Sequence, residues 1–212
     1  MSKNKIVKIK NFVDLDSLVI LPNHDLQLQF ISTCDILEPI NLKITQNQKS
    51  SFQLVCLFEH SICFNLELTI IGDNTSSKIH NLINLCENST VELNQKITTE
   101  CLNNNVKHFT KIVLEDNSIA IIKHTAKAKN LTKKLVLNQK IQALLLSPKS
   151  RVQMQPILQI ESEDVSCKHG STQGLLDDSA LFYLQSRGLD SKTSKQFLIN
   201  TFKSDILNMI LI

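Results

Sequence analysis

The stretch that decides the fold is Phe64–Thr75, which reads FNLELTIIGDNT. Its first seven residues alternate between apolar and polar side chains, which is typical of a β-strand with one buried face. The polar triplet Asp73-Asn74-Thr75 follows shortly after, and Asn tolerates the left-handed backbone conformation that tight turns need. We therefore take an alternating strand that ends in an Asn-containing turn as the repeating unit of this chain.

The same unit recurs along much of the sequence. Residues Asp25–Ser32 and Thr90–Ile97 also alternate, whereas Ser51–Phe58 is more uniformly apolar and is expected to be buried on both faces. Polar clusters lie about 13 to 16 residues apart and centre on Asn47, His60, Asn74, Asn88, Asn104, Asn117 and Asn130. Because the turns of an ordinary sandwich are closer, at roughly 8 to 12 residues, this spacing favours a β-helix.

Composition narrows the range of functions. The chain has 212 residues, of which 42% are hydrophobic, which is enough for one sizeable packed domain. A net charge of +3 is too balanced for a nucleic-acid-binding surface, and the absence of Trp argues against base stacking. The N-terminal lysines precede no apolar stretch, and no run approaches the roughly 18 apolar residues of a membrane span. We therefore expect a cytoplasmic protein that binds neither nucleic acid nor membrane.

Six cysteines are present, and none forms a CxxC pair. In the cytoplasm they are expected to be thiols, and all except Cys167 are expected to be small buried apolar side chains. The sequence contains neither GxGxxG nor GxxxxGK, so we expect no nucleotide on this chain. If ATP is used, a partner must bind it.

The pattern changes after Gly174. The residues Leu176–Ser179 offer caps for a helix over Ala180–Arg187, which Gly188 would end, and Ser191 or Ser194 is expected to cap a second helix. Apolar residues recur there at helical spacing, at Phe197, Leu198, Phe202, Ile206, Leu207 and Ile210. This divides the chain into a β-helix core, 1–174, and a C-terminal helical segment, 175–212. The helices either pack on the end of the core or present a face to a partner.

The segment Glu161–Gly174, ESEDVSCKHGSTQG, carries the candidate chemistry. On a strand, Cys167 and His169 project to the same face and supply two ligands of a tetrahedral metal site, which suits zinc or iron. A thiol beside an imidazole is also a nucleophile with its base. A third interpretation is a plain strand end that turns at Gly170. The residues alone leave these three interpretations open.

The region Arg151–Gly188 resembles the C-terminal signature of the SufB/SufD family, which belongs to the SUF machinery for iron–sulfur cluster assembly. The Cys-x-His-Gly form is similar to the SufD branch. The resemblance covers about Val106–Leu207. The matching features, in order, are Asn138-Gln139, Leu144–Ser147, Pro156, Glu163–Val165, Cys167-x-His169-Gly170, Leu181–Leu184 and Ser186–Gly188.

The resemblance implies a mainly β protein, a right-handed parallel β-helix followed by a short helical segment. It also implies a scaffold subunit that is not itself an enzyme. Such a subunit pairs with a SufB-like partner, or with itself when alone, and its helices engage a SufC-like ABC ATPase. Cys167 and His169 would lie at the subunit interface, where a transient iron–sulfur cluster is built on the complex. The candidate ATPase contacts are Phe197, Leu198, Phe202 and Ile206.

Two alternatives to this function remain. The first is a degenerate structural paralogue that binds the ATPase partner without touching iron. The second is a β-helix carbohydrate-active enzyme. Scattered acidic residues and the lack of Trp to stack on sugar disfavour that enzyme.

Overall fold

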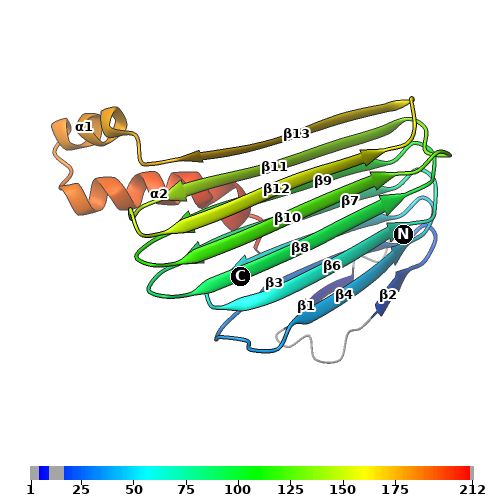
Figure 1. The fold of residues 1–212 in the computed structure, drawn as a ribbon, viewed down its shortest axis with the longest axis horizontal. Helices are drawn as coiled ribbons and strands as arrows, with labels where there is room; N and C mark the ends of the chain where they lie inside the picture. Colours follow the sequence, from blue (N-terminus) through cyan, green and yellow to red (C-terminus); the bar gives the residue numbers. More distant parts are fainter. Residues whose placement is uncertain (1–4, 10–16, 211–212) are drawn as a thin grey trace.

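The fold is a stack of parallel strands, with two helices at its C-terminal end (Figure 1). A computed structural model describes residues 5–9 and 17–210. The strands are β1 (Lys5–Ile9), β2 (Ser17–Ile20), β3 (Asp25–Ile31), β4 (Ile40–Gln46), β5 (Ser51–Phe58), β6 (Ile62–Ile70), β7 (Ser76–Leu85), β8 (Thr90–Thr99), β9 (Asn105–Leu114), β10 (Ile119–Ala128), β11 (Leu135–Leu145), β12 (Arg151–Ile160) and β13 (Val165–Gly174). The helices are α1 (Asp178–Ser186) and α2 (Ser191–Leu207).

Successive strands alternate between two sheets. The odd-numbered strands form a seven-stranded sheet in the order β1-β3-β5-β7-β9-β11-β13, and the even-numbered strands form a six-stranded sheet that runs β2 to β12. Every strand pair is parallel, and Ser51 lies in register with Ser76, which lies in register with Asn105. Each coil therefore contains two strands, and the turn spacing seen in the sequence is half a coil. The predicted β-helix is confirmed.

The alternating strands place their apolar residues between the two sheets. In β6 buried and half-buried positions alternate from end to end, as the FNLELTI pattern predicts. Phe30, Phe58 and Phe64 pack together inside, with ring centroids 5.5–5.6 Å apart. Burying a side chain of this size contributes roughly 1.5–3 kcal/mol, so this aromatic cluster is a main stabiliser of the coils formed by β3 to β6.

The turns use Asn in two ways, and only one was expected. Asn74 has a φ of 58°, as the sequence predicts, but in the turns at Asn88 and Asn117 the preceding Glu87 and Asp116 take the left-handed conformation. There the Asn side chains link neighbouring coils, because the Asn117 amide donates to Asn88 Oδ1 at 3.1 Å. The turns thus stack on one another as the strands do.

The helix boundaries confirm one predicted cap and correct another. The Asp177 carboxylate accepts hydrogen bonds from the first turn of α1, and Gly188, with a φ of 95°, ends that helix as predicted. The predicted caps Ser191 and Ser194 of the second helix are wrong. Asp190 is the cap, since its carboxylate accepts from the Thr193 N–H at 2.9 Å.

Helix α2 packs on the outer face of the seven-stranded sheet rather than on the end of the core. Ile206 contacts Val55 and Leu82 there. Because α2 covers Val55, this residue of β5 is buried on the outer face, whereas Gln53 and Leu57 beside it are only half-buried. The expectation that the whole strand is buried on both faces is therefore correct only under the helix.

The cysteines are all free thiols. Cys56 is buried in the core, but Cys34 and Cys86 are exposed, so the expectation of small buried side chains is wrong for these two. Both follow the end of a strand, where the alternation that directs a residue inward has stopped. Within residues 5–9 and 17–210, no helix has the length and apolar character of a membrane span.

Candidate functional site

The candidate residues lie in the last coil, at the open end of the solenoid. Strand β13 pairs only with β11, and β12 pairs only with β10, so both sheets end at the same edge (Figure 1). In the described part of the chain no further strand continues either sheet beyond them. A parallel strand at such an edge keeps unpaired N–H and C=O groups, and these can accept another strand.

Cys167 and His169 project from β13 on the side that continues the interior of the solenoid. Cys167 lies in register with Leu137, and His169 lies in register with Gln139; both of these β11 residues are buried. Cys167 is half-buried and packs against the main core, whereas His169 is exposed. The predicted shared face is present, and it opens at the free end of the stack.

The Cys167 thiol is not activated as a nucleophile. Partial burial raises its pKa, because the thiolate loses hydration. A catalytic cysteine needs the opposite shift and a base within hydrogen-bonding reach. Over the described residues, neither Cys167 nor His169 makes a side-chain hydrogen bond. The geometry therefore supports a ligand or a strand end better than a nucleophile.

Among the side chains that the structure describes, the pair does not form a closed metal site. No group of three or more His, Cys, Asp or Glu side chains that could hold a metal ion occurs among residues 5–9 and 17–210. A structural zinc site has four ligands, and Cys167 with His169 supplies two. A cation bound here would need donors beyond the side chains described in this chain.

A column of polar side chains runs through the core below this site, and the sequence analysis missed it. Asn81 donates to Gln95 Oε1 at 2.8 Å and to Thr110 Oγ1 at 2.9 Å, and Thr110 Oγ1 lies 3.2 Å from His124 Nε2. His108 Nε2 also bonds to Gln95 Oε1. Most buried polar groups in proteins are hydrogen-bonded, and these side chains satisfy much of their hydrogen-bonding capacity through one another.

At the end of the column nearest β13, several buried polar atoms have no hydrogen-bond partner among the described residues. The rings of His108 and His124 stack with centroids 3.6 Å apart, and burial lowers the pKa of both, so both are neutral. Both Nδ1 atoms and the side-chain amide of Gln139 lack a partner. Gln139 lies in register between His108 and His169, so the unpaired groups lie directly under the open end.

The sequence contains one sign of buried polar residues, although it does not show that they form a column. VKHFTKI of β9 and IIKHTAK of β10 each place a His at an inward position of an alternating strand. Only the register of the two sheets shows that these positions meet.

The four candidate contact residues of α2 divide into two groups. Phe197 is 54% exposed and Leu198 is partly exposed, so both are available to a partner. Ile206 is 2% exposed against the sheet, and Phe202 is half-buried with Lys111 Nζ 5.0 Å from its ring centroid. Thus α2 both packs on the core and keeps an exposed apolar side.

Comparison with known proteins connects this geometry to a family. The model described as "SUF system FeS cluster assembly, SufBD core domain" matches residues 36–202. The match begins well before Val106, where the resemblance in the sequence analysis began, and so it also covers the middle coils of the solenoid.

Individual relatives agree with the family match. The chain is 28% identical over 145 residues to Protein ABCI7, chloroplastic, of Arabidopsis thaliana, covering 68% of this chain and 30% of that protein. It is 38% identical over 63 residues to the SufD protein of Escherichia coli, covering 30% and 15% respectively. It is 28% identical over 149 residues to SufD of Bacillus subtilis, covering 65% and 34%. The chain thus spans about a third or less of the length of these relatives.

Proposed function

Since the chain belongs to the SufBD family of SUF iron–sulfur cluster assembly proteins and is SufD-like within it, we propose that it is a scaffold subunit, not an enzyme by itself. The observation that carries this proposal is the position of Cys167 and His169 at the free end of both sheets. Two donors at an open edge suit a cluster site that a second subunit completes. The cluster is the cargo of the complex and binds transiently.

The partner at this edge is a SufB-like subunit. The last coil leaves several apolar side chains only half-buried against the core, namely Val152, Met154, Leu158 and Val165. Another solenoid end would cover these side chains, and its strands would pair with the free edges of β12 and β13. When the SufB-like subunit is absent, a second copy of this chain would use the same edge.

Cluster building at this edge would couple iron binding to proton release. Iron binds the thiolate, and the raised pKa of Cys167 keeps the thiol protonated in the isolated chain. His169 is exposed and offers its imidazole without rearrangement of the core. With two ligands only, the isolated chain is expected to hold iron weakly, and the complex strongly.

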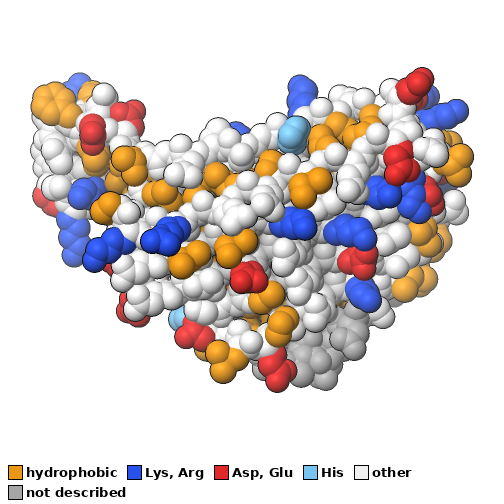
Figure 2. Space-filling model, viewed as in Figure 1, with side chains coloured by type: hydrophobic (Ala, Val, Ile, Leu, Met, Phe, Trp, Pro, Cys, Tyr) orange, Lys and Arg blue, Asp and Glu red, His pale blue; other side chains and the backbone are white. Residues whose placement is uncertain are grey.

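The helical segment is the docking site that we propose for a SufC-like ATPase. Phe182 of α1 is 73% exposed and Phe197 of α2 is 54% exposed. Figure 2 shows apolar side chains at the surface of the helical end of the molecule. A cleft of about 640 Å³ lies between the helices and the turn after β11, and Leu146, Leu176 and Leu181 are among its lining residues. Since the sequence has no phosphate-binding loop, the nucleotide would be bound by the ATPase.

We propose a cytoplasmic location. The six cysteines are free, and two of them are exposed, which suits a reducing compartment.

Purification of the tagged protein from its native cell without oxygen tests this function. We expect a SufB-like subunit and a SufC-like ATPase to co-purify. Recovery of the ATPase without a SufB-like subunit would favour the degenerate paralogue, and recovery of neither would contradict membership of a SUF complex. Phe197→Ser should release the ATPase, whereas the control Leu131→Ser, at a turn residue that is 71% exposed, should not.

A further inference from the structure

The outer face of the seven-stranded sheet is rich in lysine and poor in acid. Strands β5, β7, β9, β11 and β13 contain no Asp or Glu. In the described strands of this sheet the one acid is Asp25, at the first residue of β3, where its carboxylate accepts a hydrogen bond from the Ser51 hydroxyl. In strands β7 to β13, the lysines that the register places on the outer face are Lys78, Lys107, Lys111, Lys140 and Lys168.

These lysines are close enough to repel one another. Lys78 and Lys107 are direct partners on neighbouring strands, and Lys168 lies two strands further along the same row. Neighbouring strands are about 4.8 Å apart, so this row spans roughly 14 Å from β7 to β13. Like charges directly opposite each other destabilise a sheet, and this cost is a reason to look for an anionic partner.

The six-stranded sheet has four lysines in its strands, and two of them are paired with acids. Lys96 pairs with Glu67 at 3.0 Å, and Lys127 pairs with Glu161 at 3.1 Å. Lys43 and Lys123 have no ion pair within the described residues, so the two sheets differ in degree: two of these four lysines are paired, against one of the five on the outer face of the seven-stranded sheet.

Helix α2 already supplies one carboxylate to this face. The helix covers the C-terminal parts of the strands, and its Asp205 carboxylate lies 2.5 Å from Lys111 Nζ. That hydrogen bond lowers the pKa of Asp205. The other four lysines of the face are exposed, and no ion pair engages them among the described residues.

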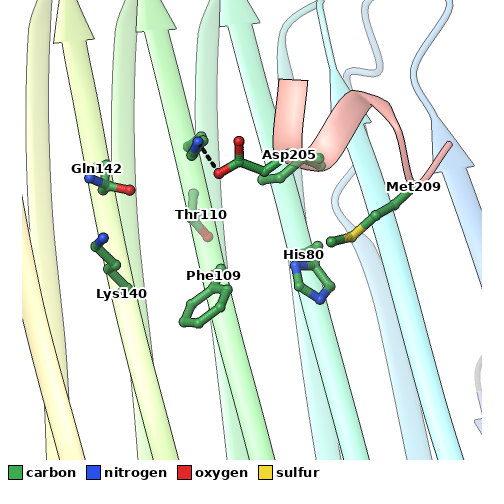
Figure 3. Close-up of a pocket in the computed structure, with 9 residues that line it drawn as sticks. His80, Phe109, Thr110, Lys140, Gln142, Asp205 and Met209 are labelled. Carbon is green, nitrogen blue, oxygen red and sulfur yellow. Dashed lines mark hydrogen bonds and ion pairs between the residues drawn. The ribbon is translucent and has the colours of Figure 1, made fainter. Parts of the chain in front are cut away.

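A pocket joins the covered and the uncovered parts of the face. It has a volume of about 210 Å³ and lies beside α2, where Lys140, Phe109 and His80 extend from three neighbouring strands below Asp205 (Figure 3). Burial lowers the pKa of His80, and the charges of Lys78 and Lys107 lower it further. Lys78 and Lys107 therefore place positive charge near His80, while the Asp205 carboxylate that also lines the pocket is paired with Lys111.

We propose that the uncovered lysines Lys78, Lys107, Lys140 and Lys168 bind an acidic segment of a partner protein, with one carboxylate in the pocket beside Lys140. The occupant is a protein segment because the lysines extend over four strands, which is wider than one small anion. The group that already occupies Lys111 is likewise a carboxylate side chain. Lys78, Lys107 and Lys140 lie on the sheet face away from the open end, whereas Lys168 lies on the edge strand β13 and points to the opposite face from Cys167 and His169. The inference therefore does not depend on a metal or cluster being bound at the open end.

The probe for this proposal is a fluorescein-labelled peptide of eight glutamates, titrated with the 212-residue chain while the peptide's anisotropy is recorded. We expect binding at low salt and its loss at high salt, because salt screens exposed charges. The variant Lys107→Gln/Lys140→Gln should bind about fivefold or more weakly, since it removes two ion pairs. The matched control Lys43→Gln/Lys123→Gln removes the same charge from the exposed face of the other sheet and should bind within about twofold of wild type.

Three outcomes would overturn the proposal. Equal weakening in both variants would mean that net charge alone attracts the peptide. Displacement of the peptide by an equal concentration of inorganic phosphate would mean that the pocket is a small-anion site. No binding of the peptide at low salt would mean that the lysines are only a solvated surface. Circular dichroism of both variants checks that they are folded.

Discussion

Lowering the pH from 7 to 5 is expected to destabilise the fold through the two stacked histidines in its core. The pKa of a histidine in an unfolded chain is about 6.5, whereas burial lowers the pKa of His124 to about 3 and that of His108 well below its usual value. Below pH 6.5 the unfolded state takes up protons that the native state does not. The free energy of unfolding therefore falls as the pH falls, from about 6.5 towards 3.

The linkage relation gives the size of this effect. Between pH 7 and pH 5, each buried neutral histidine lowers the free energy of unfolding by about 2 kcal/mol, so the pair accounts for about 4 kcal/mol. His80, whose pKa burial also lowers, acts in the same direction. Asp205 has a lowered pKa and loses its contribution only below this range. A loss of this size is a large part of the stability of an ordinary domain.

Urea unfolding followed by circular dichroism at pH 7, 6 and 5 measures this loss. His124→Gln keeps a polar group near Thr110 but cannot titrate, so its pH dependence should be about 2 kcal/mol smaller than that of wild type. Gln139→Leu is the control, since it removes a buried, unpaired amide and should change stability equally at every pH. An unchanged pH dependence in His124→Gln would refute this reasoning.

Further predictions concern the turns, the helices and the nucleotide. Gly72→Ala should cost at least about 2 kcal/mol in urea unfolding, because the added Cβ would lie 1.9 Å from the backbone nitrogen of Gln48. Lys111→Met removes the hydrogen bonds that Lys111 donates to Asp205 and to the Phe202 carbonyl, at 2.5 and 2.6 Å, and should make α2 more susceptible to limited proteolysis. Calorimetry with Mg-ATP should show no micromolar binding to the isolated chain, since a partner is proposed to bind the nucleotide; measurable binding would contradict that assignment.

The strands were predictable because alternation is a local signal. FNLELTI shows its period of two within seven residues, and the turn at Asn74 follows directly. Local competition was harder to judge: Asp190 and Ser191 are both good helix caps, and the structure uses Asp190, whose carboxylate also accepts from the Thr193 hydroxyl at 2.7 Å.

The site was predictable only in part, because half of it depends on long-range register. Cys167 and His169 share a face for the same reason that any residues two apart on a strand do. The spacing of residues along one strand does not predict the polar column, because Gln95 and His108 lie on strands of different sheets that meet across the core. The position of Cys167 next to Leu137 likewise depends on the pairing of two strands whose matched residues are thirty positions apart in the sequence.

Anaerobic reconstitution with iron and sulfide, on the complex of this chain with a SufB-like subunit, tests the central claim most directly. Cys167→Ser and His169→Gln should each assemble the complex, as size-exclusion chromatography would show, but hold at least about fivefold less cluster by visible absorption and iron content, because each loses a ligand. Cys86→Ser removes an exposed thiol far from β13 in the sequence and should match wild type. If both ligand variants reconstitute as much cluster as wild type, the pair is only a strand end. If they instead fail to assemble the complex, their role is structural.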